Sequence, residues 1–538
     1  MFDTLQMYGR FAFGLRRFYR ERTSLEQARA LVGQCLRQRD DNFLRIVRTA
    51  VFGCPRSPYR WLFGVAGCEF GDVEKLVAEG GVEHALRALR QAEIYVRFEE
   101  FKGRRPMRRG SQQLEVRPED FFNPFLANAY YSSSGGSTGA GSRIPHDLDH
   151  LRLQAAQQAV TQDTHGVLGL PTAIWCGVLP DGSGVNYILR SGHIGHIPER
   201  WFSEASPWRI RPSTLKFRIA TLIPVIGGRL AGLRMPFPET LELGDAVVLA
   251  RWAEAAVRAR GGCLINSSVS RAVRVCVAAA EAGISLRGAT FRMSGEPVSQ
   301  AKAERITASG ARFYSSFAQS EAGRVGEGCA SPSDPSDVHL LSGFVALIAH
   351  PRAVATTPGD PAPADSSLSV VDSLHLTTLL PQAPIIMLNT ELDDCGTIER
   401  RACGCPLEQL GMDVHLRNIY SYDKLTSEGV TLAGSDLVRI LEEVLPAQFG
   451  GTPQDYQFLE AEDDAGFTRL SLLISPRLRI EDEQRVKETI LHSIRKTGPG
   501  GVSAVGILQQ ADTLQIQRRD PVWTDRGKLL TLHKQRSR

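Results

Sequence analysis

The feature that most constrains the fold is a regular alternation of helix-like and strand-like segments that begins near residue 244. The spacing of apolar residues predicts helices over 244–260 and 270–282, and the apolar runs 262–267 and 287–294 predict the strands that follow them. Helices that alternate with strands in this order favour an α/β fold built of layers. In such folds ligands bind where strands end, so functional residues are expected there first.

The C-terminal part of the chain has a pattern of its own from about residue 420. Two strand-like runs, 458–462 and 468–474, flank a short acidic turn, and an amphipathic helix over 481–496 and a strand over 502–508 follow. This is the pattern of an α+β module of about one hundred residues, an ordinary size for a small domain.

The length of the chain supports a division into domains. A chain of 538 residues is too long for one simple core, so two or more domains are expected. We predict a large N-terminal domain of layered sheets and helices over residues 1–419, with a helical, variable first part over 1–119. A small, mobile α+β domain over 420–538 would follow it.

Composition and charge narrow the classes of function. Hydrophobic residues make up 42% of the chain and charged residues 23%, both ordinary for a globular protein. The net charge of +4 is small and no long basic run is present, which gives no reason to expect nucleic acid as a partner. No apolar secretory segment follows the basic N-terminus, and the apolar stretch 217–235 is interrupted by arginines, which a spanning helix would exclude. We therefore expect a cytoplasmic protein without a membrane partner.

A loop rich in Ser and Gly over 132–142 is the first candidate for a functional site. Glycine lets the backbone approach a phosphate closely, and successive N–H groups can form a nest that binds an anion. The hydroxyl groups of Ser134, Ser137 and Thr138 would add further donors. A flexible Ser/Gly linker has a similar composition and is the more common interpretation of this pattern on its own.

Two further candidates lie at and after the strand predicted over 287–294. The segment Ser-Gly-Glu-Pro over 294–297 ends that strand, where a ligand would bind, although a simple turn into a helix has the same pattern. Glu321 follows the aromatic Phe317, and a carboxylate close to bound phosphates would hold Mg²⁺. A solvated glutamate in a loop is the alternative interpretation.

The last two candidates lie towards the C-terminus. Asp394 follows the apolar run 385–388, which we predict as a strand, and an acidic residue near a strand end suits the hydroxyl pair of a ribose. Lys528 follows Gly527 on a loop near the end of the chain, from which an ammonium group can reach a negatively charged centre. An ordinary acidic turn and a disordered basic tail are the alternatives.

Each motif alone is a modest signal, but their order and spacing together resemble the adenylate-forming superfamily of acyl-CoA synthetases, luciferases and peptide-synthetase adenylation domains. The resemblance runs over residues 120–538 and is greatest to the phenylacetate-CoA ligase branch. The family's phosphate loop, Thr-Ser-Gly-Ser-Thr-Gly, matches residues 134–139, although Gly141 and Ser142 stand where Pro and Lys usually follow. The resemblance implies a large adenylation domain and a small mobile C-terminal domain.

The resemblance also implies roles for individual residues. Residues 294–297 match the family's Gly-Gly-Glu-Pro at the adenine, and residues 317–321 match its Tyr-Gly-x-Thr-Glu, with Phe317 stacked on the adenine. The aspartate that binds the ribose falls on Asp394, with Asp393 as a near alternative. The implied catalytic residues are Lys528, Thr138 and Glu321, which also holds Mg²⁺, and the implied nucleotide-binding residues are Ser134, Gly135, Gly136, Ser137, Gly139, Ser294, Gly295, Glu296, Pro297, Phe317, Ser320 and Asp394.

The hinge between the two domains departs from the family pattern. The family has Gly-Arg-x-Asp just before the position of Gly429, and this chain has Tyr-Ser-Tyr-Asp-Lys over 420–424. Asp423 is the hinge candidate, and the usual arginine is missing unless Arg417 replaces it. The departure bears on the second half-reaction, which in the family follows a rotation of the small domain.

Four residues match a further feature of the phenylacetate-CoA ligase branch. Cys329 and His339 follow the Mg²⁺ glutamate, and Cys403 and Cys405 form a Cys-x-Cys pair, although Pro406 replaces the glycine of the family. Thiolates and an imidazole in a set of four suit a structural Zn²⁺, and four unrelated residues are the alternative. The remaining cysteines do not predict a disulfide framework in a chain without a secretory signal.

The function that the resemblance implies is ATP-dependent activation of a carboxylic acid as acyl-AMP, with release of pyrophosphate, followed by transfer of the acyl group to CoA. Transfer to an amine or a carrier protein is the alternative acceptor chemistry, and a non-catalytic ATP-binding relative is the alternative class. The sequence does not identify the acid, but Tyr314, Ser315 and Ser316 are candidates to line its pocket. A homodimer is left open.

Overall fold

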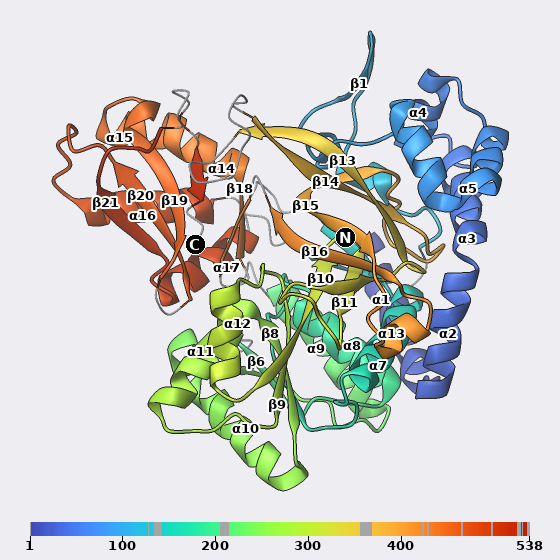
Figure 1. The fold of residues 1–538 in the computed structure, drawn as a ribbon, viewed down its shortest axis with the longest axis horizontal. Helices are drawn as coiled ribbons and strands as arrows, with labels where there is room; N and C mark the ends of the chain where they lie inside the picture. The colour runs from blue at the N-terminus through green and yellow to red at the C-terminus, as the bar shows by residue number, and fades with distance from the viewer. Residues whose placement is uncertain are drawn as a thin grey trace.

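The computed structural model describes residues 2–126, 129–133, 143–204, 215–355, 368–421, 424–427, 430–463, 466–496, 499–523, 529 and 531–534 (Figure 1). A mixed α/β body built on one sheet of twelve strands makes up most of the molecule, and a smaller sheet of four strands lies in the C-terminal part. The α/β layering expected from the sequence is confirmed. Within the described residues no helix is long and apolar enough to cross a membrane.

One half of the large sheet consists of parallel strands. In spatial order these are β10 (Arg312–Gln319), β9 (Ala289–Ser294), β8 (Cys263–Ser268), β5 (Thr172–Trp175), β6 (Arg200–Ser203) and β7 (Pro238–Thr240). Ser268 pairs with Ser294, and Ser294 pairs with Ser316 on the next strand. The carboxyl ends of these strands therefore lie at one edge of the sheet, where ligands bind in folds of this kind.

The other half of the large sheet is antiparallel. It continues from β10 through β11 (Gly323–Gly328), β12 (Val338–Leu340), β16 (Val414–Ser421), β15 (Thr390–Arg400), β14 (Leu368–Thr378) and β13 (Val345–Ala355). This half of the sheet brings segments far apart in sequence together: the side chain of Gln319 at the end of β10 donates a hydrogen bond to Asp394 of β15.

The helices α10 (Val247–Arg260) and α11 (Val269–Glu281) confirm the alternation predicted from the sequence. The first ends at Gly261, whose φ of +77° favours glycine, and the second begins at Ser268, whose side chain accepts a hydrogen bond from the backbone N–H of Arg271. Their apolar faces pack with buried residues of the strands β8 and β9 in one hydrophobic cluster. The residues that end and begin these helices and the burial of their apolar faces on the sheet thus both favour helices at these positions.

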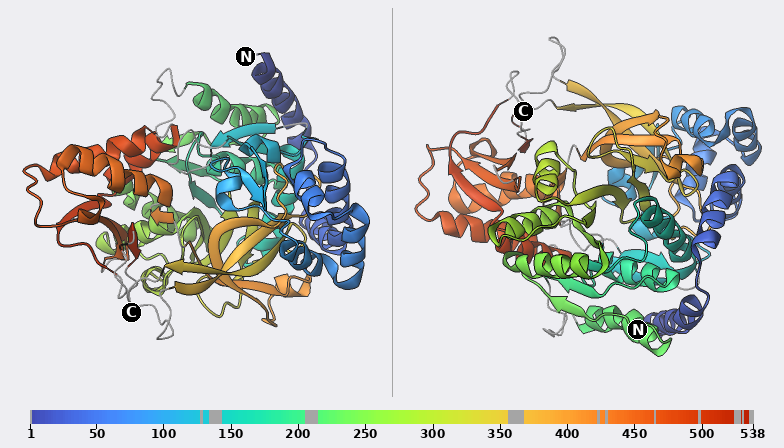
Figure 2. Two further views of the ribbon diagram at one scale, coloured as in Figure 1. Left: turned by 90° about the horizontal axis from the view of Figure 1, so that it is seen from above. Right: turned by 60° about the horizontal axis from the view of Figure 1, so that its bottom comes forward.

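The N-terminal part of the chain is largely helical. Its elements are α1 (Phe2–Arg20), α2 (Leu25–Arg37), α3 (Arg39–Ile46), a π-helical turn (Val47–Phe52), α4 (Pro58–Ala66), α5 (Phe70–Gln91) and α6 (Phe98–Phe101). The long helix α5 is interrupted at Gly80 and Gly81, where Gly81 has a φ of +76°. Figures 1 and 2 show α2 to α5 at the opposite side of the molecule from the C-terminal sheet.

Several further elements complete the large body. They are the short strands β1 (Met107–Arg109), β2 (Gln112–Leu114), β3 (Ala129–Ser133) and β4 (Arg143–Asp147), and the helices α7 (Leu148–Thr164), α8 (Ser183–Ile194), α9 (Leu215–Leu230), α12 (Gln300–Ala308) and α13 (Pro406–Gln409). Of these, α7 and α8 pack against each other and carry polar side chains that are buried beside the sheet.

The C-terminal part has a sheet and a hydrophobic cluster of its own. The sheet is β21 (Leu514–Arg518), β20 (Thr468–Ile474), β19 (Tyr456–Glu462) and β22 (Leu532–Lys534), and the other elements are β17 (Lys424–Ser427), β18 (Val430–Ala433), α14 (Gly434–Arg439), α15 (Leu445–Phe449), α16 (Glu483–Arg495) and α17 (Pro499–Gln510). The predicted hairpin over 458–474 is confirmed by the antiparallel pair β19 and β20, and the predicted helix by α16.

The strand predicted over 502–508 is wrong, because these residues lie in the helix α17. Ala504, Val505 and Leu508 are all buried, a spacing that places them on one face of a helix. A short apolar run without alternating polar residues has no period that separates a buried strand from a buried helix.

Candidate active site

A cavity of about 500 Å³ opens at the edge of the sheet where β9 and β10 end, and this volume is in the usual range of small-molecule sites. It is also lined by Ala504 and Ile507 of α17, so the C-terminal part contributes to its wall. Every predicted nucleotide or Mg²⁺ residue within the described parts of the chain lines this one cavity: Ser294, Gly295, Glu296, Pro297, Phe317, Ser320, Glu321 and Asp394.

The turn at the end of β9 is fixed by a contact to the neighbouring helix. Gly295 has a φ of +85°, a conformation that side chains rarely adopt, so glycine suits this position. The carboxylate of Glu296 accepts hydrogen bonds from the backbone N–H of Ser270, at 3.2 Å, and from its hydroxyl group. Ser270 lies in the first turn of α11, where a negative charge is stabilised by the helix dipole. The local structure thus holds Glu296 at the rim of the cavity.

The segment that carries Phe317 is bent by an irregularity in its strand. The pairing of β10 with β11 shifts register between Phe317 and Ala318, and such bulges bend a strand and redirect its side chains. Phe317 is half-buried and Ser320 is exposed in the turn that follows. Both side chains line the cavity beside the turn at Gly295.

Glu321 forms an ion pair with Lys102, which the sequence did not predict. Lys102 directly follows α6, so this contact joins segments that are 219 positions apart. Both side chains are largely buried, with exposed fractions of 13% for the lysine and 11% for the glutamate. The candidate Mg²⁺ ligand therefore already has a cation beside it.

Asp394 lies inside β15, and not after a strand at 385–388 as predicted. In that run only Ile385 forms a bridge, an isolated one with Phe122. The Asp394 carboxylate accepts hydrogen bonds from the side-chain amide of Gln319 and from the hydroxyl group of Ser421. The two partners hold the carboxylate at the cavity, where its oxygens could instead meet the hydroxyl groups of a ribose.

Lys534 connects the small C-terminal sheet to this region. It lies in β22, and its ammonium group donates a hydrogen bond to the backbone oxygen of Ser421 at 2.9 Å. The same group is 3.4 Å from a carboxylate oxygen of Glu460 in β19. Lys534 is therefore part of a sheet and not of a free tail, and it contacts Ser421, whose hydroxyl group binds Asp394.

Of the three residues predicted to line the pocket for the acid, Tyr314, Ser315 and Ser316, two line the cavity. Ser315 and Ser316 line the cavity, whereas Tyr314 stacks on His165 at a ring distance of 3.8 Å and lines a second cavity of about 460 Å³. Burial lowers the pKa of His146 to about 3 and the pKa of His150 to about 4, so both imidazoles in the main cavity are neutral at pH 7.

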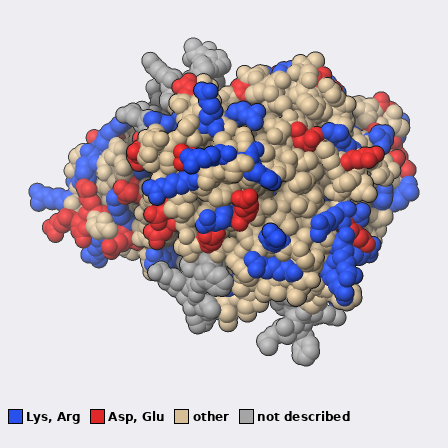
Figure 3. Space-filling view, turned by 90° about the horizontal axis from the view of Figure 1, so that it is seen from below, with Lys and Arg blue, Asp and Glu red and all other residues tan. Residues whose placement is uncertain are grey.

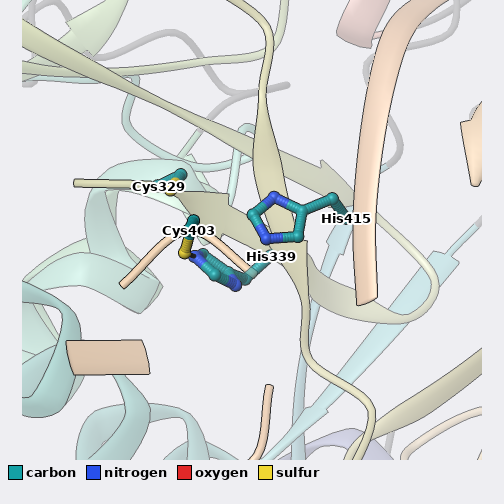
Figure 4. Close-up of side chains that lie close together, drawn as sticks. All are labelled: Cys329, His339, Cys403 and His415. Atoms are coloured by element: carbon teal, nitrogen blue, oxygen red, sulfur yellow. Dashed lines mark hydrogen bonds between the residues drawn. The ribbon is translucent and has the colours of Figure 1, made fainter. Parts of the chain in front are cut away.

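A cluster of cysteine and histidine side chains lies beside the antiparallel half of the sheet (Figure 4). Candidate ligand atoms of Cys329, His339, Cys403 and His415 all lie within 4.8 Å of one another. The sulfur of Cys405 is 3.0 Å from Nε2 of His339, so the predicted residue Cys405 also belongs to this group. The four predicted residues are thus brought together, and His415 joins them as a fifth.

The hydrogen bonds around the cluster fit a metal with nitrogen and sulfur ligands. His339 Nδ1 lies 2.7 Å from the backbone oxygen of Met412, and His415 Nδ1 lies 2.7 Å from Asp337. Each Nδ1 can therefore donate its proton, which leaves Nε2 as the free ligand atom. Nε2 of the fully buried His415 has no hydrogen-bond partner among the described residues. Imidazoles and thiols in this arrangement suit Zn²⁺.

Comparisons with known proteins identify the fold. No protein-family model and no curated protein matches the sequence. Among solved structures, a 2-hydroxyisobutyryl-CoA ligase in complex with 2-HIB-AMP and CoA matches at a TM-score of 0.51 and 13% identity, over 95% of this chain and 90% of the other. The chain has the fold of this CoA ligase.

Weaker similarities to other ligases accompany this match. The o-succinylbenzoate CoA synthetase of Bacillus subtilis gives a TM-score of 0.40 at 10% identity, over 78% of this chain and 71% of the other. The amide bond synthetase of Marinactinospora thermotolerans gives 0.38 at 12% identity, over 83% of this chain and 76% of the other.

Other predicted residues lie outside the described part of this ligase fold: Ser134, Gly135, Gly136, Ser137, Thr138, Gly139, Asp423 and Lys528. The residues that sequence reasoning missed are Lys102, the buried cavity arginines Arg190, Arg271, Arg292 and Arg324, and His415. Lys102 lies in a basic turn, and the arginines look like any surface arginine when the sequence is read alone. Only their burial distinguishes them, and burial depends on contacts between distant segments.

Proposed function

We propose that the chain is an AMP-forming carboxylate ligase that activates a carboxylic acid with ATP and passes the acyl group to CoA. The observation that carries the proposal is the convergence of residues 294–297, Phe317, Glu321 and Asp394 on one cavity, in a chain with the fold of a CoA ligase. The sequence motifs alone predict a nucleotide contact for each of these residues, so a chance meeting in one cavity is a poor explanation.

In the first half-reaction a carboxylate oxygen of the acid attacks the α-phosphorus of ATP, the bond to the β-phosphate breaks, and pyrophosphate leaves. Phe317 would stack on the adenine and Asp394 would accept hydrogen bonds from the ribose. Glu321 would hold Mg²⁺, which neutralises charge on the phosphates. The loop at 134–139, with Thr138, and Lys528 would supply further donors, so the protein contributes chiefly positioning and charge.

In the second half-reaction the thiol of CoA attacks the acyl carbon and AMP leaves with the electron pair of the broken bond. The cavity lies between the ends of β9 and β10 and the helix α17 of the C-terminal part. A rotation of a domain over 420–538 about a hinge near Asp423 would therefore change one wall of the cavity between the two steps. An amine or a carrier protein in place of CoA would use the same first step.

One contact favours the alternative of a non-catalytic nucleotide-binding relative. Lys102 pairs with Glu321, the residue proposed to hold Mg²⁺, and so puts a fixed cation where the metal would bind. Pyrophosphate release with a panel of carboxylic acids tests the two functions against each other. Release that depends on an acid supports the ligase, and nucleotide binding without release with any acid supports the alternative.

We also propose that Cys329, His339, Cys403 and Cys405 hold one structural Zn²⁺, which would link the chain to the phenylacetate-CoA ligase branch. The proposal rests on the convergence of these side chains and on the orientation of His339 by Met412. A structural zinc has all four positions filled by protein, so it would stabilise this part of the sheet without taking part in the chemistry.

Protein purified without added metal should contain about one Zn²⁺ per chain, and Cys405→Ser should lose it and unfold at a lower temperature, because structural metal binding contributes to folding. Elemental analysis and thermal denaturation measure the two effects. Cys276→Ser is the matched control, since Cys276 is a buried thiol of α11 outside the cluster. A zinc content near zero in a protein of normal stability would contradict the proposal.

A second pair of variants identifies the fourth ligand. If Cys405 completes the set, His415→Ala should keep the metal while Cys405→Ser loses it. The opposite result would assign that position to His415, whose ring is already oriented by Asp337.

A further inference from the structure

Four buried arginines line the cavity that holds the candidate nucleotide residues. One of them, Arg271 of α11, forms an ion pair with Glu204. The other three are Arg190 of α8, Arg292 of β9 and Arg324 of β11, and their exposed fractions are 8%, 4% and 3%. The nucleotide motifs assign no role to any of them.

One glutamate serves two of these arginines. A guanidinium nitrogen of Arg292 donates a hydrogen bond to Oε1 of Glu327 at 2.9 Å, and a nitrogen of Arg324 lies 3.0 Å from the same oxygen. Glu327 is fully buried, and although burial opposes its ionisation, the two arginines hold its pKa below the usual range. Glu327 is therefore ionised and balances one of the two positive charges beside it.

Arg190 is different, because it makes no ion pair within the described part of the chain. Its Nε donates to the amide oxygen of Gln158 at 3.0 Å, and its Nη1 lies 3.5 Å from the amide oxygen of Gln154. Both acceptors are neutral. Burial is the main cause that holds the pKa of Arg190 well below its usual range, and the positive charges of Arg324 and Arg292 add to it. This environment is therefore unfavourable for a cation.

The acids that line the cavity do not supply the missing charge. Each has contacts elsewhere: Glu296 with Ser270, Glu321 with Lys102, Asp394 with Gln319 and Ser421, and Asp181 with Ser183. On the molecular surface, by contrast, cations have acidic side chains near them: Figure 3 shows Lys and Arg interspersed with Asp and Glu over much of one face. A buried cation without an anion is costly, and such groups are usually paired.

We propose that the acid activated in this cavity carries a second anionic group, in the first place a second carboxylate, which binds Arg190 at the floor. The first carboxylate would then lie towards Glu321 and the nucleotide. A guanidinium group binds a carboxylate through two parallel hydrogen bonds, so it fixes both the charge and the orientation of the distal end. This assignment rests on the proposed ligase function and adds the class of its substrate.

One neutral group suits the same ligand. His150 lines the cavity, and its buried Nδ1 has no hydrogen-bond partner among the described residues, whereas both ring nitrogens of the neighbouring His146 have partners in Ser132 and Asn186. A neutral imidazole can donate a hydrogen bond to a carboxylate without adding a further positive charge. The part of the cavity around Arg190 therefore offers an anion one cation that has no ion-pair partner among the described residues, with polar groups near it.

The test compares pairs of acids with matched carbon skeletons: succinate with butyrate, glutarate with pentanoate, and phthalate with 2-methylbenzoate. Acid-dependent exchange of pyrophosphate into ATP should be at least about 100-fold more efficient with the preferred diacid than with its partner, because a buried polar site left unpaired rejects a ligand strongly. This comparison uses the unaltered protein, so it does not depend on the folding of a variant.

Arg190→Met should remove most of that preference, and Arg190→Lys should keep part of it, while the KM for ATP stays unchanged in both. Arg109→Met is the control for the loss of a buried arginine, since Arg109 pairs with Glu100 and does not line the cavity. It should leave the ratio of diacid to monoacid unchanged.

Three outcomes would overturn the assignment, and they differ in what else they affect. A preference for monoacids in the unaltered protein would overturn it and leave the ligase function standing. A raised KM for ATP in Arg190→Met with an unchanged diacid preference would show that Arg190 binds the triphosphate instead. Absence of exchange with every acid would overturn the proposed function, and the substrate class with it.

Discussion

Replacing Glu321 by alanine should abolish acid-dependent exchange between pyrophosphate and ATP, with a loss of at least about 100-fold, the size seen when one charge-stabilising group is removed from an active site. The physical reason is local charge. The triphosphate must be neutralised before a carboxylate can approach it, and Mg²⁺ requires a hard oxygen ligand to do so. The fold should survive although the largely buried Lys102 loses this partner, because Glu321 lies in the turn between β10 and β11 and not within a strand or helix.

The ion pair with Lys102 makes a sharper experiment possible. If Glu321 acts through Mg²⁺, the double variant Glu321→Ala/Lys102→Met should be as inactive as the single one. If Glu321 serves only to balance Lys102, removal of both charges should restore exchange. Glu304→Ala, at an exposed position of α12, is the control for a glutamate outside the cavity and should be unaffected. Normal exchange in Glu321→Ala would rule out the assignment.

The parts of the fold that could be predicted from the sequence are those where local signals and burial agree. Over residues 244–294 the helices have clear ends at Gly261 and Ser268, and the strands β8 and β9 are buried along nearly their whole length. In α17 the local signal is ambiguous, since small and apolar residues follow one another without a period. Its helical state is decided by packing of Val505 and Leu508 against the C-terminal sheet, which a sequence pattern does not contain.

In the candidate site, too, some residues could be predicted from the sequence and others could not. Ser294, Phe317 and Glu321 could be placed together because the carboxyl ends of neighbouring parallel strands share an edge, so residues that follow such strands meet. Lys102 and Arg190 could not, because each reaches the cavity through long-range contacts and has no motif around it. What distinguishes Arg190 is a buried position without an acidic partner among the described residues, which is a property of the folded chain alone.

Lys528 near the C-terminus is expected to act in the first half-reaction only. Lys528→Ala should reduce formation of the acyl-adenylate by roughly two orders of magnitude or more, because an ammonium group on a flexible stem can bridge the attacking carboxylate and a phosphate oxygen. The same variant should convert chemically supplied acyl-adenylate to product at a nearly normal rate, since a moving domain would carry Lys528 away for that step. Separate assays of the two half-reactions measure both effects.

Lys534 is the matched control, and its contacts set the size of its effect. It joins β22 to the backbone of Ser421 and to Glu460, but this ion pair is about a quarter exposed, and partly exposed pairs contribute at most about 1 kcal/mol. Lys534→Ala should therefore change adenylate formation by less than about fivefold. If Lys534→Ala is the damaging change and Lys528→Ala is silent, the family match at the C-terminus is misplaced by six residues. If both are silent, no lysine near the C-terminus assists the chemistry, and a nucleotide-binding protein without ligase activity becomes the better account of this cavity.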